Sequence, residues 1–441
     1  MTSEAVAGPD LHNRRYLALL GGAALLGIPL SLVAFLFLAA VHELEHLLWH
    51  SLPHELGYAE PPAWWAIAAL GLGGVLVGLA VRYLPGHGGH VPADGFSAGG
   101  ASASAVPGVV LAAGAGLALG AVVGPEAPLI ALGGGLALLA IRWTRFADDP
   151  QATMILSGAG SAAAISAIFG NPLIAAILFL EIVGLARRQA TLVLLPCLVA
   201  SGVGAVLFTG LGDWTGFGIG SLAIPDLEAT GLSVGDVVLV FPLAAAVSVV
   251  TWVIFGVGKR VAVIAGEHVL AGTIGAGLVA GCGAALYAVL TDHSPAEVAL
   301  SGQATLGTLA SSPDSWSTGA LVALIVLKGV AYAVCLGAFR GGPAFPAIFL
   351  GAAIGVLAFT LVPSVELVPA LAIGMAAGVA VIGLPITSVL LVVLLLGDAA
   401  ASQMPVVILA AVVALVVGEL LTTYGSRRQT QESAVAAATA P

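Results

Sequence analysis

Apolar runs dominate the pattern of this chain, and short polar or glycine-rich breaks separate them. Some runs reach the roughly 20 residues that a helix needs to cross a bilayer, whereas others are shorter and are interrupted by Gly or Pro. Irregular backbone at membrane depth is tolerated only where protein covers it or where it lines a cavity. The pattern predicts an all-α polytopic membrane protein with short, tilted and re-entrant helices. The apolar segments are residues 16–41, 64–84, 106–123, 128–141, two within 152–186 that are split at Gly170-Asn-Pro172, 191–211, 236–257, 262–290, 319–338, 346–362, 367–382, 385–397 and 404–421.

Composition supports this class and excludes others. Of the 441 residues, 59% are hydrophobic and only 8% are charged, whereas a soluble domain carries about 25% charged residues. The net charge of −10 comes without a basic patch, so we expect no nucleic-acid partner. The three cysteines have no motif spacing, which argues against a disulfide framework or a zinc ribbon, and we predict no cofactor.

One acidic residue, Glu126, interrupts the apolar run at residues 120–135. It follows Gly124 and Pro125, and Pro is well suited to the start of a helix. The segment from Glu126 onward therefore reads as a helix that begins at membrane depth, where unpaired N–H groups and the helix dipole favour an anion. A carboxylate in hydrocarbon is costly, so Glu126 is the first functional candidate. The alternative is a structural acid bonded to neighbouring N–H groups.

A second glycine–proline block repeats the first. When Gly124 is aligned with Gly342, the 17 positions from 124 to 140 match at 8. Another pair of blocks begins at Gly170 and Gly383. The offsets of the two pairs, 218 (342 − 124) and 213 (383 − 170), are nearly equal, so the chain reads as a duplication. Paired, interrupted segments in two halves are the best sequence pointer to the binding site of a transporter.

Basic residues predict that the two halves have inverted topology. Arg142 and Arg145 follow the first block, whereas Arg340 precedes the second, and basic residues prefer the cytoplasmic side. Arg14 and Arg15 precede the first span, so we expect both termini in the cytoplasm and the protein in the plasma (inner) membrane. The predicted parts are a tail at residues 1–15, a first repeat at 16–211, a loop at 212–234, a second repeat at 235–425 and a short C-terminal tail at 426–441.

Three glycine-rich breaks lie in order along the chain, and they read Gly88-Gly89-His90-Val91-Pro92, Gly124-Pro125-Glu126-Ala127-Pro128 and Gly342-Pro343-Ala344-Phe345-Pro346. In order, spacing and placement they resemble the signature loops of the CLC family of chloride channels and chloride/proton exchangers. The family patterns are Gly-Ser-Gly-Ile-Pro, Gly-Lys/Arg-Glu-Gly-Pro and Gly-x-Phe-x-Pro. The resemblance covers roughly residues 16–425 and implies a homodimer with one pore in each subunit.

The resemblance implies roles for several residues. Glu126 is similar to the family's gating glutamate, whose carboxylate occupies an anion site and swings away, or takes a proton, to admit chloride. Backbone N–H groups near Glu126, Ala127, Ala344 and Phe345 would then line the anion path. Tyr424 is the only late candidate for the family's central tyrosine.

The chain also departs from the family patterns. Gly89 aligns with the serine that contacts the anion in many members, and His90 beside it could supply a polar contact instead. Pro125 replaces the usual basic residue. The intracellular proton-transfer glutamate of exchangers aligns near Ile182, so the neighbouring Glu181 is the candidate for an internal proton path. The alternative for Glu181 is a buried acid paired with Arg187 or Arg188.

A rival motif suggests an enzyme. The sequence His42-Glu43-Leu44-Glu45-His46 matches H-E-x-x-H, in which two His four residues apart bind zinc and the Glu acts as general base. An intramembrane zinc metalloprotease is therefore the alternative function. The simpler reading is an amphipathic segment at the end of the first span, and we expect a transport protein without enzymatic activity.

Two forms of anion transport fit the sequence. A passive chloride conductance gated by Glu126 fits the missing inner proton acid. A chloride/proton exchanger would use Glu126 with a different internal route, through Glu181 or water. The expected partners are chloride or similar small anions, protons, membrane lipid and a second copy of the chain.

Overall fold

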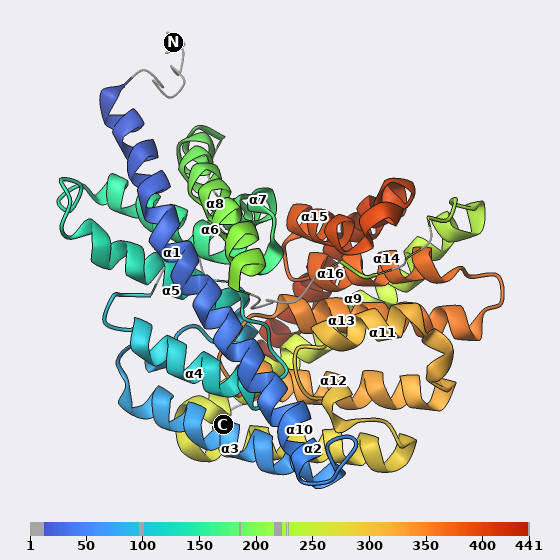
Figure 1. Cartoon of the computed structure of the whole chain (residues 1–441). Coiled ribbons are helices and arrows are strands. Elements are labelled where there is room, and N and C mark those ends of the chain that lie inside the picture. The colour runs from blue at the N-terminus through green and yellow to red at the C-terminus, as the bar shows by residue number, and fades with distance from the viewer. Residues whose placement is uncertain are drawn as a thin grey trace. The chain divides into compact units, whose positions relative to one another are not determined.

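The structure, a computed structural model, describes residues 13–96, 101–184, 187–215, 223–225, 227 and 229–439 (Figure 1). Helix follows helix through these residues, and no β-strand is found among them, which confirms the predicted all-α class. The helices are α1 (Arg14–His46), α2 (Leu52–Glu55), α3 (Ala63–Tyr83), α4 (Val106–Ala118), α5 (Glu126–Ile141), α6 (Pro150–Phe169), α7 (Pro172–Val183), α8 (Arg187–Thr215), α9 (Val234–Glu267), α10 (Val269–Thr291), α11 (Gln303–Ser311), α12 (Thr318–Ala338), α13 (Ala344–Leu361), α14 (Leu367–Ala380), α15 (Pro385–Leu396) and α16 (Ala400–Thr439).

The helices differ in length as the apolar pattern predicts. In the described part of the chain, nine helices are long and apolar enough to cross a membrane. Four further apolar helices, α4, α5, α7 and α14, have only 10–17 residues. A helix rises 1.5 Å per residue, so these four are too short to span a hydrocarbon core of about 30 Å. The protein is therefore a multi-pass membrane protein that mixes spanning helices with short ones.

Two helices run further than the hydropathy pattern suggested. α9 is one helix of 34 residues that passes through Lys259 and Arg260, although the pattern divided this region into two segments. α16 continues to Thr439, through most of the residues predicted as a tail. Lys, Arg and Ala are all good helix formers, so a polar or weakly apolar stretch ends the hydrophobic signal without ending the helix.

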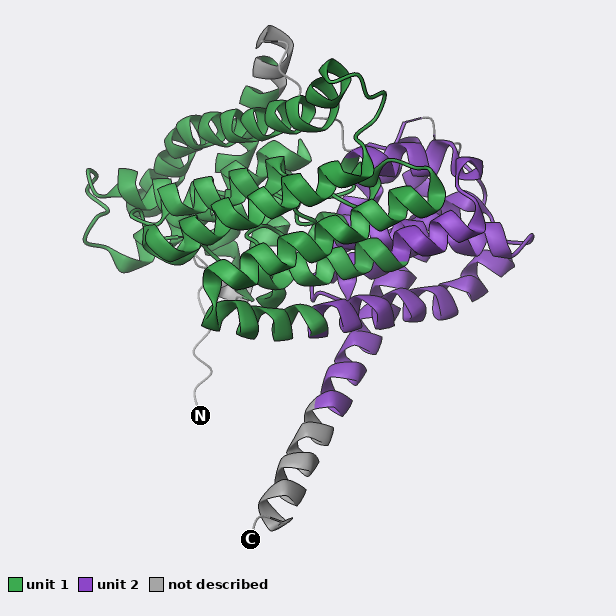
Figure 2. Ribbon diagram, turned by 90° about the horizontal axis from the view of Figure 1, so that it is seen from below, with its two compact units in different colours: residues 1–222, 257–303, 326–346 green, residues 223–256, 304–325, 347–441 purple. Residues whose placement is uncertain are grey.

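The described helices group into two compact units (Figure 2). Unit 1 comprises residues 1–222, 257–303 and 326–346, and unit 2 comprises residues 223–256, 304–325 and 347–441. Each unit is assembled from stretches that are distant in the sequence. Unit 1 contains both glycine–proline blocks up to Pro346, so the neighbourhood of Glu126 belongs to one unit.

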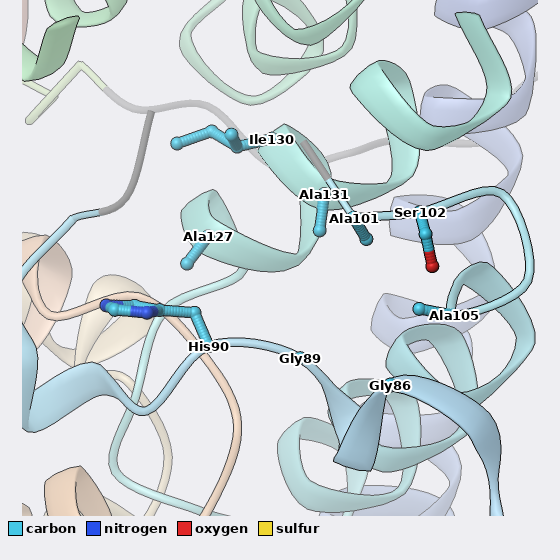
Figure 3. A pocket seen from close by; sticks show the side chains of 9 residues that line it. All are labelled: Gly86, Gly89, His90, Ala101, Ser102, Ala105, Ala127, Ile130 and Ala131. Carbon is cyan, nitrogen blue, oxygen red and sulfur yellow. The ribbon is translucent and has the colours of Figure 1, made fainter. Parts of the chain in front are cut away.

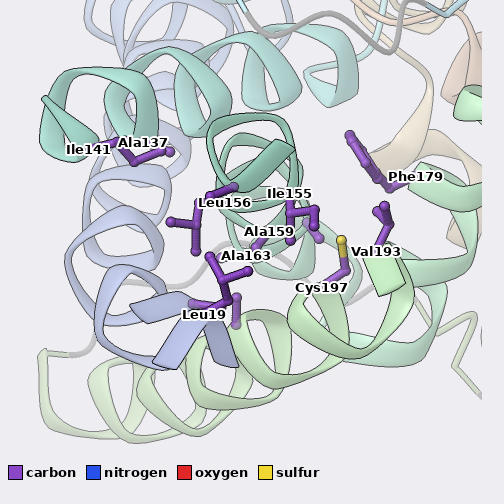
Figure 4. Close-up of a cluster of buried hydrophobic side chains, with 14 of the residues drawn as sticks. Leu19, Ala137, Ile141, Ile155, Leu156, Ala159, Ala163, Phe179, Val193 and Cys197 are labelled. Carbon is purple, nitrogen blue, oxygen red and sulfur yellow. The ribbon is translucent and has the colours of Figure 1, made fainter. Parts of the chain in front are cut away.

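A hydrophobic cluster of unit 1 forms around α6, in which Ala, Gly, Ser and Thr make up more than half of the residues (Figure 4). α6 packs against α1, α5 and α8. Ala159 and Ala163 are fully buried, and the larger Leu19 and Phe179 reach the same cluster from α1 and α7. Small residues let neighbouring backbones approach closely, which replaces the hydrophobic driving force that lipid cannot supply.

The same glycine contact is built into both halves of the chain. In unit 1, a Cβ on Gly133 of α5 would lie 2.3 Å from the carbonyl oxygen of Gly160 in α6. In unit 2, a Cβ on Gly351 of α13 would lie 2.0 Å from the carbonyl oxygen of Gly374 in α14. Gly133 and Gly351 are matched positions of the two blocks. The duplication therefore extends from the sequence to the way in which the helix that begins at each block crosses the next helix.

We expect a methyl group at this crossing to destabilise the protein. Gly351→Ala places its Cβ against backbone, which cannot move aside easily, and should lower stability by about 1–3 kcal/mol. Gly275→Ala in α10 is the matched control, because its Cβ meets nothing within 4 Å and the change should stabilise the helix by about 0.5–1 kcal/mol. Thermal unfolding in detergent, followed by circular dichroism, measures both. Equal midpoints for the two variants would contradict the close crossing.

Candidate functional site

The site forms where the two glycine–proline blocks meet. Gly124 and Gly342 exchange backbone hydrogen bonds in an isolated antiparallel bridge, with N···O distances of 2.6 and 2.5 Å. Glu126 begins α5 two residues after Gly124, and Ala344 begins α13 two residues after Gly342. The bridge therefore holds two helix N-termini side by side, and each brings N–H groups that no helical carbonyl can accept.

The carboxylate of Glu126 lies on these N–H groups. The side chain is fully buried, and the backbone N–H of Phe345 donates to Oε1 at 3.0 Å. The amides of Ala344 and of Glu126 itself also interact with the carboxylate. Oε2 has no hydrogen-bond partner among the described residues. The site thus combines two positive helix N-termini with one acid. One oxygen of that acid, Oε2, accepts no hydrogen bond from the described residues.

Glycine on both sides makes room for this carboxylate. A Cβ on Gly124 would lie 2.1 Å from Oε2 of Glu126, and a Cβ on Gly342 would lie 1.7 Å from the same oxygen. Any other residue at either position would displace the side chain. The sequence motif therefore encodes a narrow space that is fitted to an anionic group.

A tyrosine that sequence reasoning did not select completes the surroundings. Tyr332 of α12 is fully buried, and its hydroxyl donates to the carbonyl oxygen of Pro343 at 2.6 Å. The hydroxyl also lies close enough to Glu126 to interact with it electrostatically. The sequence held one signal, since Tyr332 is the only aromatic residue of α12.

A cavity of about 280 Å³ opens beside the first turn of α5 (Figure 3). Three of the predicted anion-binding residues, Gly89, His90 and Ala127, line it together. His90 is anchored, because its Nε2 lies 2.9 Å from the carbonyl oxygen of Gly95. Two more predicted residues, Ala344 and Phe345, lie at the carboxylate of Glu126, the residue before Ala127. The structure thus gathers five of the predicted residues around the start of α5.

The structure does not gather the remaining two predicted residues there. Tyr424 lies on α16 in unit 2, and its side chain is 68% exposed. Glu181 is partly buried on α7 and has a polar partner, while the side chains of Arg187 and Arg188 lie outside the described residues. The roles predicted for Tyr424 and Glu181 stay predictions.

The H-E-x-x-H motif falls on the last two turns of α1. The ring of His46 stacks on that of His50, with centroids 5.4 Å apart, and its Nδ1 lies 3.3 Å from Oγ of Ser51. In the described part of the chain, no three His, Cys, Asp or Glu side chains are grouped so that they could hold a metal ion. Catalytic zinc sites use three protein ligands, and the described residues offer this motif no third ligand, which the protease alternative needs.

Comparison with known proteins identifies the family. The sequence profile described as "Voltage gated chloride channel" matches residues 73–419. The chain belongs to this family, the CLC family. It is 30% identical over 347 residues to the "Putative ion-transport protein YfeO" of Escherichia coli (strain 55989 / EAEC). The aligned residues cover 78% of this chain and 79% of the relative. The homologue from Escherichia coli O9:H4 (strain HS), which has the same name, matches with the same identity and coverage.

Solved structures of CLC proteins share the fold. A slow cyanobacterial Cl⁻/H⁺ antiporter superposes with a TM-score of 0.71 at 18% identity, over 91% of this chain and 94% of its own. A CLC-type fluoride/proton antiporter gives a TM-score of 0.62 at 18% identity, over 91% and 95% of the two chains. A eukaryotic CLC transporter gives 0.68 at 16% identity, over 92% and 72%. At these identities the likeness establishes the architecture alone.

Removal of the Tyr332 hydroxyl tests how firmly the second block is held. Tyr332→Phe leaves the buried carbonyl of Pro343 without its donor, which should cost about 1–3 kcal/mol of stability. Tyr83→Phe is the matched control, because the ring of Tyr83 is 68% exposed and the change should stay within about 0.5 kcal/mol. Thermal unfolding in detergent compares them. A Tyr332→Phe midpoint equal to that of the control would show that the hydrogen bond contributes nothing.

Proposed function

We propose that this protein carries chloride or similar small anions across the membrane along a path that Glu126 gates. One observation carries the proposal: the Glu126 carboxylate, fully buried, accepts the Phe345 N–H where two helix N-termini meet. Helix N-termini in a dry interior bind anions by offering N–H groups in place of a hydration shell. The side chain then occupies the position that a transported anion would take.

Gating follows from competition between two negative groups for one set of N–H donors. While the carboxylate is charged and in place, it blocks an anion both by occupying the space and by repulsion. When it takes a proton or swings away, the donors become available to the anion. Oε2, which has no hydrogen-bond partner among the described residues, is the oxygen that can accept this proton without breaking the bond from Phe345.

The cavity beside α5 extends the proposed path. Gly89, His90 and Ala127 line it, so an anion there meets a histidine ring and a glycine-rich backbone next to the first turn of α5. His90 supplies a polar side chain where Gly89 supplies none. A cluster of weak polar contacts lets an anion bind and also leave, which conduction requires.

Passive conduction and exchange for protons both use this competition. In exchange, the proton that releases Glu126 has to be delivered to the other side of the membrane, and Glu181 or internal water would carry it. In passive conduction no such route is needed. The proposal includes a homodimer with one path per subunit, surrounded by lipid in a plasma membrane, with both termini in the cytoplasm.

Replacement of Glu126 by glutamine tests the gate. Glu126→Gln is permanently neutral, so anion flux in reconstituted vesicles should become independent of pH. In the parent protein, acid removes the competing charge, so flux should rise as pH falls. Asp149→Asn is the control, because that carboxylate pairs with Arg15 at the N-terminus of α6, outside the site. An unchanged pH dependence in Glu126→Gln would remove Glu126 from the mechanism.

A paired flux measurement separates the two forms of transport. Vesicles with a chloride gradient and no proton gradient are followed with a chloride electrode and a pH-sensitive dye. Proton movement driven uphill by chloride identifies exchange, and Glu126→Gln should abolish it. Chloride flux without proton movement identifies a passive path. The absence of any anion flux in well-folded parent protein would reject the proposed function as a whole.

A double-mutant cycle tests whether the carboxylate itself blocks the path. Gly342→Ala puts a methyl group where Oε2 lies, so it should displace the side chain and raise pH-independent flux, as Glu126→Ala should. In the Glu126→Ala background, the same change should add less than about twofold, because the group it displaces is gone. Additive effects of the two changes would mean that Gly342 acts on the path by another route.

A further inference from the structure

A second charged residue is buried beside the site, and the gating scheme does not use it. Arg340 lies two residues before Gly342, and its side chain is only 9% exposed. Its guanidinium donates to backbone carbonyls: Nε to His87 at 3.2 Å, and Nη1 to Phe339 at 3.1 Å and Ala338 at 3.4 Å. Nη2 takes part in none of these hydrogen bonds.

Within the part of the chain that the structure describes, no carboxylate pairs with this charge. Among the residues that the structure describes, the recorded ion pairs do not include Arg340. Carbonyl dipoles satisfy the N–H groups, but they leave the net charge of the guanidinium in place. A buried charge without a counter-ion is costly, and inside a membrane protein such a charge marks an ion pathway.

Another buried cation of unit 1, Lys328, has different surroundings from Arg340. Lys328 is fully buried, and its ammonium donates to the four successive carbonyls of residues 297–300, at 2.8 to 3.2 Å. Glu297 lies close enough to act on this ammonium electrostatically. Among the described residues, Lys328 therefore has an acidic neighbour that acts on it, whereas Arg340 has none.

Arg340 supports the loop that lines the cavity. The accepting residue, His87, stands in a run of four residues with positive φ, from Gly86 to Gly89. A Cβ on Gly88 would lie 3.3 Å from Cγ of Arg340, so the loop rests directly on this side chain. Gly86 and Gly89 face the cavity in Figure 3. The guanidinium thus lies behind one wall of the cavity and close to the bridge at Gly342.

We propose that Arg340 is the fixed positive charge that draws anions into the cavity beside α5 and so sets the sign of the ion that enters. This inference rests on the proposed anion transport and adds a specificity-determining residue to it. A unit charge near a bound anion, at an effective dielectric constant of about 20, changes the anion's affinity by on the order of tenfold. The charge acts without contact, because carbonyls already hold the guanidinium in place.

The rival explanation is that Arg340 only fixes the loop. Two variants separate charge from hydrogen bonding. Arg340→Gln keeps a donor and removes the charge, whereas Arg340→Lys keeps the charge and loses the planar set of donors that reaches His87. Lys328→Gln is a control for the loss of a buried cation, since Lys328 has Glu297 as an acidic neighbour.

The experiment measures the half-saturating chloride concentration for flux in proteoliposomes made with full-length protein. It is repeated at two ionic strengths, set with a large organic salt that does not permeate. Isothermal titration of chloride into the detergent-solubilised protein provides a second measurement that does not depend on flux.

If the charge acts, Arg340→Gln raises the half-saturating concentration about tenfold, and Arg340→Lys stays within about threefold of the parent. Raising the ionic strength should change the effect of Arg340→Gln little, because salt screens buried charges much less than exposed ones. Lys328→Gln should lower thermal stability but leave the half-saturating concentration unchanged.

Three results would overturn the inference. In the first, Arg340→Gln binds and carries chloride with the parent's half-saturating concentration. In the second, Arg340→Lys loses as much affinity as Arg340→Gln, which assigns the role to hydrogen bonding. The third result applies if Arg340→Gln does not fold. In that case Arg340→Lys tests the inference alone, and a loss of about tenfold in its chloride affinity would overturn it. Parent protein that carries no anion at all rejects the proposed function instead, before any variant is compared.

Discussion

The arrangement around Glu126 depends on a short backbone bridge. Gly124 and Gly342 are separated by more than two hundred residues, yet two hydrogen bonds hold them together inside unit 1. Because a helix begins two residues beyond each glycine, the bridge determines where two sets of unpaired N–H groups point. The side chain of Glu126, the ring of Tyr332 and the guanidinium of Arg340 are then arranged around this junction. A bridge of two glycines also leaves space beside it, and the carboxylate fills that space.

The fold could be predicted from the sequence because the patterns that encode it are either local or repeated. Glycine–proline blocks mark where helices break, and the two blocks matched each other, so their meeting could be anticipated from the duplication. Glu126 stood out as one acid in an apolar run. Residues that depend on contacts distant in sequence were harder to find. Tyr332 looks like an ordinary core aromatic until α12 is seen beside Pro343, and Arg340 was read only as a topological marker. Tyr424 was selected by its place late in the chain, and that place does not determine what its side chain meets.

The two halves use one packing solution twice. Gly133 crosses Gly160, and Gly351 crosses Gly374, each pair in its own unit. Burying apolar surface between helices gains little free energy in lipid, because lipid is itself apolar. Close backbone contact therefore has to hold the short helices in place. This explains why 59 glycines are tolerated in a helical protein. Some of them, such as Gly133 of α5 and Gly374 of α14, are contact surfaces of helices that are too short to cross the membrane.

The ammonium of Lys328 has a consequence for the loop that it holds. Four successive carbonyl oxygens converge on it, in the manner of ligands around an alkali metal ion. The last of the four belongs to Leu300, whose N–H donates to the carbonyl of Gly120, four residues before Gly124. A diffusible ion in that place would exchange with the surrounding electrolyte, and the loop would respond to its composition. Because the cation is covalently tethered to α12, the geometry of this loop does not depend on which salts the cell encounters.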